Sequence, residues 1–344
     1  MYTDDDLNDA VSAGVLSHET ATAFRDHVAT RRQTPVADEE QFRLITGFND
    51  IFVVIACVLL LLSVSWIAGS ASGVLGAVAT AATAWGLAEF FVRQRRMALP
   101  AIVLLLAFSG NVFSTGLGLA APALGGSSVE GMMRHAPSAA VALASLLAGV
   151  ATWLHWRRFQ VPITIACVSA AAVACLIALI TSVLPAVDGV MTLLLLVAGI
   201  AVFAFAMRWD TSDPARQTRR SDVAFWLHLL AAPLLVHPVF MLLGVTDGDV
   251  GMPQAVAVVV LYVGIALVSL CIDRRALMVS ALGYVLYAFS ALLKQYGVVT
   301  LGFATTALFI GSALLMLSAF WQPSRAALIA RLPASLQSRL APVR

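Results

Sequence analysis

Residues 51–69 read IFVVIACVLLLLSVSWIAG, and residues 73–96 read GVLGAVATAATAWGLAEFFVRQRR. The first stretch is continuously apolar and close to the length of about 20 residues that an α-helix needs to cross a bilayer. Residues 70–72 must turn the chain tightly, and the second stretch ends in the basic segment 93–96. Together they predict two membrane helices joined by a short turn, with a basic end on one side of the membrane.

The same pattern continues along the chain. The mean hydropathy is +0.90, and 60% of the residues are hydrophobic while 12% are charged, against about 25% charged residues in soluble domains. These values exclude a soluble globular protein and predict an all-α, polytopic membrane helix bundle of about ten transmembrane helices. The predicted spans are 51–69, 73–92, 99–120, 137–156, 161–184, 189–207, 222–244, 253–272, 276–294 and 298–321.

The Lys and Arg residues lie in every second connection between these spans. With the N-terminus in the cytoplasm, the 21 basic residues all fall on the inner side except Arg134 and Lys294. The opposite orientation would break the positive-inside rule almost completely. The segment 1–43 is too acidic and polar for a cleaved signal peptide. We therefore expect a multi-pass protein of the bacterial cytoplasmic (inner) membrane with both termini in the cytoplasm.

The segments outside the spans have patterns of their own. Residues 1–43 comprise a helical hairpin, 3–30, followed by an acidic linker. The bundle covers 44–322, and 323–344 form an amphipathic tail, interrupted at Pro333, that should lie on the inner leaflet. A hairpin of this size cannot bury enough apolar surface to be stable alone. We expect it to dock on a protein partner, on a second copy of the chain or on the bundle. The bilayer is the other expected partner, and nucleic acid is not.

The hairpin carries the turn Ala-Gly-Val-Leu-Ser at residues 13–17 and precedes a long polytopic region. In this layout the chain resembles uncharacterised bacterial families of predicted membrane proteins that have a short N-terminal cytoplasmic helical hairpin. The resemblance implies no activity, and no functional residue is carried over from it.

Two segments far apart in the chain are similar to each other. Residues 95–99 lead into a predicted helix that ends in Leu-Ala-Phe-Ser at 106–109, and residues 274–277 lead into one that ends in Tyr-Ala-Phe-Ser at 287–290. One interpretation is a parallel internal repeat of helices one to four and seven to ten, as in some transporter folds. The alternative is that Ala- and Leu-rich helices after two arginines look alike through composition alone.

The seventh predicted helix contains His228, Pro233, His237 and Pro238. Ionisable groups within a bilayer are costly and often functional. Each proline removes a backbone donor and frees a carbonyl that neighbours or water must satisfy. One interpretation is a kinked helix that lines a hydrated cavity, with His237 as a ligand-binding or proton-linked group. The other is that both histidines bond to neighbouring helices and that the kink serves packing.

Polar residues on two other predicted helices lie at a similar depth. Asn111, Ser114 and Thr115 lie in the outer half of the third helix, and Lys294 lies near the outer end of the ninth. Counted at about 1.5 Å per residue, Asn111 and His237 are at similar heights. We therefore predict an outward-facing, ligand-binding polar pocket lined by these five residues. The alternatives are a snorkelling Lys294 and hydrogen bonds between helices for the others.

Other candidate residues have simpler explanations. Glu89 should form an ion pair with Arg93, four residues later, rather than act in a proton relay. The cysteines lie in apolar runs without metal-site spacing and are expected to be packing residues: Cys57, Cys167, Cys175 and Cys271. The sequence has no motif for hydrolysis, phosphate binding or zinc chemistry, so we predict no catalytic residue, no metal site and no cofactor.

These features favour a transporter or permease for a small polar solute, with the outward-facing pocket as its site. Against this, a proton- or sodium-coupled carrier usually needs a carboxylate near the membrane centre, and few charged residues lie within the spans. The first alternative is a non-catalytic membrane sensor or assembly factor that acts through the N-terminal hairpin. The second is a membrane enzyme or haem protein that uses His228 and His237, with His155 as an axial partner. An enzyme is the less favoured class.

The charge pattern makes a testable prediction about topology. Single cysteines introduced within 93–98, 157–160 or 208–221 should react with a membrane-impermeant thiol reagent only after the membrane is opened, because these segments face the cytoplasm. Cysteines within 121–136 or 245–252 should react in intact cells. Labelling of a cysteine at position 216 from the periplasmic side would contradict the predicted orientation.

Overall fold

The computed structural model describes residues 4–32, 48–124, 138–183, 190–244 except 215 and 217, 252–275 and 318–337, together with isolated positions between 278 and 316 and residue 340. The chain divides into two compact units, one formed by 1–43 with Arg344 and the other by 44–343. Within the described residues, every regular element is a helix.

The first unit contains a pair of short helices, α1 (Asp4–Ser12) and α2 (His18–Arg32). Gly14 has a φ of +71° and follows the first helix, because a residue without a Cβ adopts this left-handed conformation without strain. The Ser17 hydroxyl accepts a hydrogen bond from a backbone N–H in the first turn of α2, as expected for an N-cap. The Arg25 guanidinium donates to the Asn8 side-chain oxygen at 2.8 Å and links the two helices.

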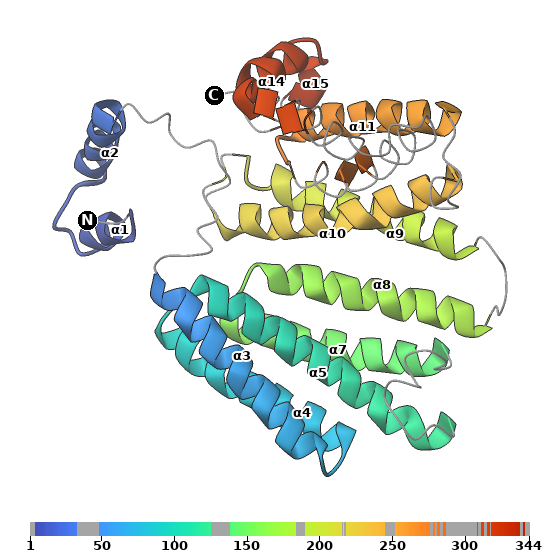
Figure 1. Ribbon diagram of the computed structural model, residues 1–344. Coiled ribbons are helices and arrows are strands. Elements are labelled where there is room, and N and C mark those ends of the chain that lie inside the picture. The colour runs from blue at the N-terminus through green and yellow to red at the C-terminus, as the bar shows by residue number, and fades with distance from the viewer. Residues whose placement is uncertain are drawn as a thin grey trace. The chain divides into compact units, whose positions relative to one another are not determined.

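The second unit contains the long helices. In chain order they are α3 (Phe48–Gly69), α4 (Gly73–Ala88), the π-helical turn η1 (Glu89–Gln94), α5 (Ala98–Leu124), α7 (Ser138–Phe159), α8 (Ile163–Val183), α9 (Val190–Thr211), α10 (Arg219–Leu242), α11 (Met252–Ile272), α14 (Trp321–Ile329) and α15 (Ala334–Gln337). Consecutive long helices run in alternating directions, so α5, α8 and α10 begin at the same end of this unit (Figure 1). We call this the inner end, and the opposite end the outer end.

The described helices agree with seven of the predicted spans. Seven helical segments are long and apolar enough to cross a membrane: α3, α4 with η1, α5, α7, α8, α9 and α10. α11 coincides with the predicted span 253–272, but its apolar stretch, Val256–Ile272, is shorter. The predicted spans 276–294 and 298–321 lie largely outside the described residues. Ten spans, the orientation of the termini and the internal repeat therefore stay predictions.

Large apolar side chains cover the outside of the long helices. On α3, Leu62, Trp66 and Ile67 are exposed by 63%, 83% and 71%. Soluble proteins rarely expose large continuous apolar patches, because contact with water makes them unfavourable. Lipid tails make the same surface favourable, so these helices form a membrane-embedded bundle.

Helix α10 begins earlier than the sequence pattern predicts. The predicted span starts at residue 222, but the helix begins at Arg219 and Thr218 is its N-cap. The Thr218 hydroxyl accepts a hydrogen bond from the Arg220 backbone N–H at 3.3 Å and donates one to the Asp213 carboxylate at 2.7 Å. A side chain bonded on both sides fixes where the helix starts, and the hydrophobic pattern carries no information about such a contact.

The C-terminal segment contains α14 and α15, with Pro333 between them where the sequence predicted an interruption. Trp321, Arg325 and Ile329 of α14 are buried, and α14 packs against α11. Protein therefore covers one face of the predicted amphipathic tail. Its placement on the inner leaflet stays a prediction.

Helices α9 and α10 approach each other closely at Gly199. A Cβ at this position would lie 2.8 Å from both the carbonyl carbon and the carbonyl oxygen of Leu234. Only a residue without a side chain leaves room for this crossing. The contact therefore sets the separation of two helices that carry buried charged groups at their inner ends.

We predict that Gly199→Leu lowers the free energy of unfolding by about 1–3 kcal/mol, because the new side chain overlaps the backbone of α10. Gly264→Leu is the matched control, since a Cβ added to Gly264 of α11 would meet no neighbouring atom within 4 Å. The control should melt at the wild-type temperature or slightly above it. Thermal unfolding of the purified proteins in detergent compares the two. Equal melting temperatures would show that α9 and α10 do not cross closely at this position.

Candidate functional site

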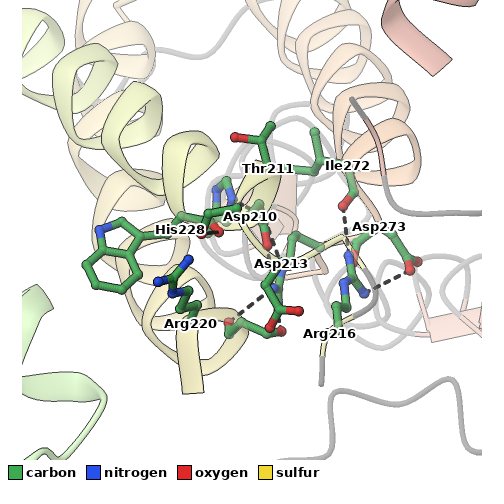
Figure 2. A network of polar contacts seen from close by, with 12 residues as sticks. Asp210, Thr211, Asp213, Arg216, Arg220, His228, Ile272 and Asp273 are labelled. Carbon is green, nitrogen blue, oxygen red and sulfur yellow. Dashed lines mark hydrogen bonds and ion pairs between the residues drawn. The ribbon is translucent and has the colours of Figure 1, made fainter. Parts of the chain in front are cut away.

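A group of charged side chains lies buried at the inner end of the second unit. The carboxylate of Asp210, in the last turn of α9, lies beside the imidazole of His228 on α10, with 2.8 Å between Oδ2 and Nε2 (Figure 2). Arg274, which follows α11, donates from Nη2 to the other oxygen, Oδ1, at 2.6 Å. We call Asp210, His228 and Arg274 the inner triad.

Arg274 also forms hydrogen bonds outside its ion pair with Asp210. Its Nη2 also donates to the backbone carbonyl and to the hydroxyl of Ser221, each at 3.1 Å. Its own backbone carbonyl accepts a hydrogen bond from the Ser269 hydroxyl. The side chain is only 1% exposed. One arginine therefore joins the end of α9, the start of α10 and the last turn of α11.

The turn after α11 explains how Arg274 reaches this position. Asp273 has a φ of +57°, in the left-handed region that ends helices. Its backbone N–H bonds to the Leu270 carbonyl, and the Arg274 N–H bonds to the Ser269 carbonyl. These two bonds close the end of the helix and leave Arg274 beside the last turn of α11, where α9 and α10 also end and begin.

Asp273 is the centre of a second group, which we call the C-terminal cluster. Its carboxylate accepts a hydrogen bond from Arg216 at 2.9 Å and one from the Trp321 indole N–H at 2.8 Å. Arg325 of α14 forms an ion pair with it at 3.7 Å. Arg216 also donates to the backbone carbonyls of Ile272 and Asp273, and so caps the end of α11 (Figure 2).

The inner triad and the C-terminal cluster both compensate the charge of a buried arginine. Arg274 and Arg325 are each 1% exposed, and an ion removed from water loses several kcal/mol unless opposite charges and hydrogen bonds replace the water. Asp210 and Asp273 supply that compensation. Burial lowers the pKa of Arg216, and the positive charge of Arg274 lowers it further. A guanidinium nevertheless stays protonated at neutral pH, because its ordinary pKa lies far above neutrality.

The protonation of His228 follows from its neighbour. An ionised carboxylate can only accept, so the imidazole donates to Asp210 through Nε2. The other ring nitrogen, Nδ1, is buried and has no hydrogen-bond partner within the described part of the chain. The ring of Phe203 packs edge-on against the imidazole at 5.3 Å between centroids. The neutral imidazole therefore bonds to Asp210 through its single N–H on Nε2.

The polar residues predicted on the third helix bond to their own backbone. The Asn111 side-chain amide donates to the Ala107 carbonyl at 2.8 Å, the Ser114 hydroxyl to Gly110 at 3.0 Å, and the Thr115 hydroxyl to Asn111 at 2.8 Å. These bonds give each of the three side chains a partner within α5, so none of them depends on a hydrated cavity for its only hydrogen bond.

The other members of the predicted pocket are placed differently. His237 and Pro233 are exposed on α10, whereas Pro238 is buried, and Lys294 lies outside the described residues. α10 packs mainly against α9 and α8, while α5 packs mainly against α4 and α7. A pocket that unites all five predicted residues therefore stays a prediction.

Glu89 forms the predicted ion pair with Arg93, at 3.3 Å. It also accepts two hydrogen bonds from Arg158 of α7, at 2.7 Å and 2.9 Å, a partner that sequence reasoning missed. The pair links η1 to the end of α7 at the inner end. The four cysteines are free thiols. Across the part of the chain that the structure describes, no three His, Cys, Asp or Glu residues gather as a metal site would require.

His155, the axial partner in the haem hypothesis, lies in an aromatic environment. It is fully buried among the rings of Trp85, Phe108 and Phe159, with centroid separations of 5.7, 5.6 and 4.4 Å. His228 meanwhile uses its Nε2 on Asp210. The described contacts of these histidines do not favour a shared haem site.

Sequence reasoning did not select Asp210, Arg274 or Arg216. Asp210 lies just beyond the predicted span 189–207, and the two arginines counted only as basic residues of inner connections. The available signal was the presence of aspartates in two otherwise basic segments, two in RWDTSDPARQTRR at 208–220 and one in CIDRR at 271–275. An acid at a basic membrane end favours a specific ion pair over a purely topological role.

A comparison with protein-family models, curated proteins and solved structures found no match for this chain. The resemblance of the hairpin and layout to bacterial families of predicted membrane proteins stays a prediction. The function is therefore argued from the geometry of the inner triad.

We predict that Arg274→Gln lowers the free energy of unfolding by about 3–5 kcal/mol, because it leaves the Asp210 carboxylate buried without its fixed cationic partner. The neighbouring Arg275→Gln is the control. Arg275 is exposed and lies over the Trp321 ring at 4.9 Å, so its loss should cost about 1 kcal/mol or less.

A double variant separates the effect of the unpaired charge from the effect of lost side-chain packing. Adding Asp210→Asn to Arg274→Gln removes the unpaired charge and should recover part of the lost stability. Thermal unfolding in detergent measures all four proteins. An equal loss of unfolding free energy in Arg274→Gln and Arg275→Gln would contradict the assignment of a buried ion pair.

Proposed function

We propose that this protein is a proton-linked transporter or permease for a small polar solute in the bacterial inner membrane. The inner triad supports the proposal best, because it places a carboxylate, an imidazole and a guanidinium between α9, α10 and the end of α11. Ionisable groups buried among membrane helices commonly belong to proton relays or ion pathways. His228 lies nine residues after the start of α10, which is about 14 Å along the helix.

Each member of the triad has a distinct chemical role in this proposal. Arg274 stays charged at every physiological pH and is the fixed partner of Asp210. His228 is the partner that carries the proton in this proposal, since an imidazole can hold one proton or two. A proton on His228 gives the carboxylate a second cationic partner and weakens its hold on Arg274. The link between the α9–α10 pair and the end of α11 then loosens.

This loosening supplies the two states that transport requires. In one state Arg274 attaches the end of α11 to α9 and α10, and the inner end is closed. In the other the attachment is weaker, and the helices separate at the inner end. Proton binding shifts the balance between the states by the difference in its affinity for them. A solute that prefers one state is thereby linked to the proton.

The proposal predicts solute-dependent proton movement. Purified protein in liposomes that contain a pH-sensitive dye should acidify the lumen when a suitable amino acid, sugar or small carboxylic acid is added outside. Asp210→Asn and His228→Gln should each reduce the initial rate at least about tenfold, since general proton-transfer groups contribute factors of this order or more. Glu89→Gln is the matched control, a carboxylate at the same inner end that is also paired with arginine, and should keep the wild-type rate.

The variants are interpretable only if they fold. His228→Gln keeps a side-chain N–H that can donate to Asp210, so its gel-filtration profile and melting temperature should stay near those of the wild type. Acidification at the wild-type rate in a folded His228→Gln protein would contradict the proton role of the triad. Lack of solute-dependent acidification by the wild type across all solute classes would contradict proton-linked transport.

A second function, as a sensor or assembly factor, has one observation in its favour. Residues 1–43 form a compact unit of their own, and on it Val15 and Phe24 remain exposed. Exposed apolar side chains on a small helical unit suit a protein partner. Deletion of 1–43 separates the two functions. Transport by the bundle should survive the deletion, whereas a sensor or assembly factor should lose its activity in cells.

A further inference from the structure

Helix α8 packs tightly against α9 and α10 toward the inner end, and a pocket lies between α8 and these two helices further out. Near the inner end, Ile165 and Ala166 of α8 join Val202, Val223 and Leu227 of the other two helices in one buried cluster. Beyond this cluster lies a pocket of about 460 Å³. Its walls include Ala170, Ala174 and Thr181 of α8, Ser138 of α7, Leu195 of α9 and Leu234 of α10. We call this pocket the α8 slot.

The α8 slot has the size of a ligand site and an apolar lining. Pockets that bind small molecules commonly measure about 300–1,000 Å³ and are mostly apolar, with a few polar groups. Ser138 and Thr181 are the polar residues of the slot lining, and the others are apolar. Ser138 begins α7 and Thr181 lies in the last turn of α8. Both hydroxyls therefore lie at the outer end of the slot.

The length of the slot matches one leaflet of a membrane. Ala170 and Thr181 lie eleven residues apart on α8, which corresponds to about 16 Å along the helix. Half of a hydrocarbon core about 30 Å thick is about 15 Å. The slot thus runs from the level of the headgroups to the middle of the bilayer. The buried cluster of α8, α9 and α10 closes it there.

The surroundings of the slot determine what fills it. Met191 of the lining, and Leu179 and Val183 on α8, are exposed on the apolar outside of the helices, so in a bilayer lipid tails are the nearest material. Apolar cavities do not hold water well, because water there finds too few hydrogen-bond partners. An empty slot would lose the dispersion contacts of its lining. An acyl chain restores these contacts without desolvating any polar group.

The outer end of the α8 slot favours a lipid headgroup that can donate a hydrogen bond. The Thr181 hydroxyl donates its proton to the carbonyls of Ile177 and Ala178, at 3.0 and 3.2 Å. Its oxygen can still accept a hydrogen bond. A headgroup with N–H donors, such as ethanolamine, offers such a bond, whereas the quaternary ammonium of choline has no N–H. We propose that the α8 slot binds one acyl chain of a bilayer phospholipid, with a hydrogen-bond-donating headgroup at Ser138 and Thr181.

Photocrosslinking in vesicles tests this site without a known transport substrate. The probe is a trace of phosphatidylethanolamine with a diazirine in its acyl chain, in phosphatidylcholine vesicles that contain the full-length protein. Crosslinks mapped by mass spectrometry should concentrate on the slot lining of α8, α9 and α10. An excess of unlabelled phosphatidylethanolamine should reduce them. Crosslinks spread evenly over all exposed apolar residues, or unaffected by the competitor, would overturn the proposal.

Two alanines of α8 provide a matched pair of variants. Ala174 lines the slot, and Ala172 is exposed on the same helix and does not line it. Ala174→Phe should fill the slot and lower the saturable crosslinking at least about fivefold, while Ala172→Phe should leave it unchanged. If Ala174→Phe does not fold, Ala174→Leu replaces it, and competition in the wild type decides the question alone. Equal crosslinking of the two phenylalanine variants would exclude the slot as the site.

Two further crosslinking experiments test the headgroup preference and whether the acyl chain belongs to a phospholipid. Thr181→Val should remove most of the preference for phosphatidylethanolamine over phosphatidylcholine probes while leaving acyl crosslinking in place. An unchanged preference would overturn the headgroup assignment. A diazirine fatty acid serves as the third probe. Saturable crosslinking by the fatty acid alone would show that the slot takes a free amphiphile and would overturn its assignment to a bilayer phospholipid.

Discussion

A charge buried among apolar helices must meet an opposite charge, and the inner end of this protein is arranged around that requirement. Asp210 is the point at which it is met, because its two oxygens face an arginine that follows α11 and a histidine on α10. With water excluded, each of these contacts is stronger than it would be at a surface. Three helix ends therefore meet at one ion pair, between the Asp210 carboxylate and the Arg274 guanidinium.

The connections at the inner end contain residues in an unusual conformation. Arg96, Gln160, Arg216 and Asp273 all have a positive φ between 53° and 57° although none is glycine. Such residues cost about 1–2 kcal/mol each relative to glycine or to a relaxed backbone. At Arg216 and Asp273 the reason is visible, since their side chains pair with each other at 2.9 Å. A glycine at either position would relieve the backbone and remove the ion pair.

Hydrophobic length was enough to predict the seven membrane-length helices among the described residues. The predicted turn at 69–73 separates α3 from α4, because a helix long enough to cross a bilayer must turn where its apolar run ends. The candidate pocket was different, since it was inferred from depth along each helix. Depth does not specify rotation, and Thr115 at the right height bonds to its own helix. The Asp210–Arg274 pair joins residues 64 positions apart, a contact that no local pattern encodes.

The inner triad and the α8 slot lie at different levels of the same pair of helices. α9 carries Asp210 near its inner end and Leu195 at the slot, and α10 carries His228 and then Leu234. Gly199 of α9 meets the backbone of α10 at Leu234, which also lines the slot, so the proposed loosening of the inner end would carry the two helices together. Pro233 lacks the N–H that would continue the hydrogen bonds of α10 beside the slot, which leaves the helix free to bend there. A change in the charge of His228 would thus alter the width of the slot, and a chain seated in the slot would resist that change in turn, because coupling between two sites is reciprocal.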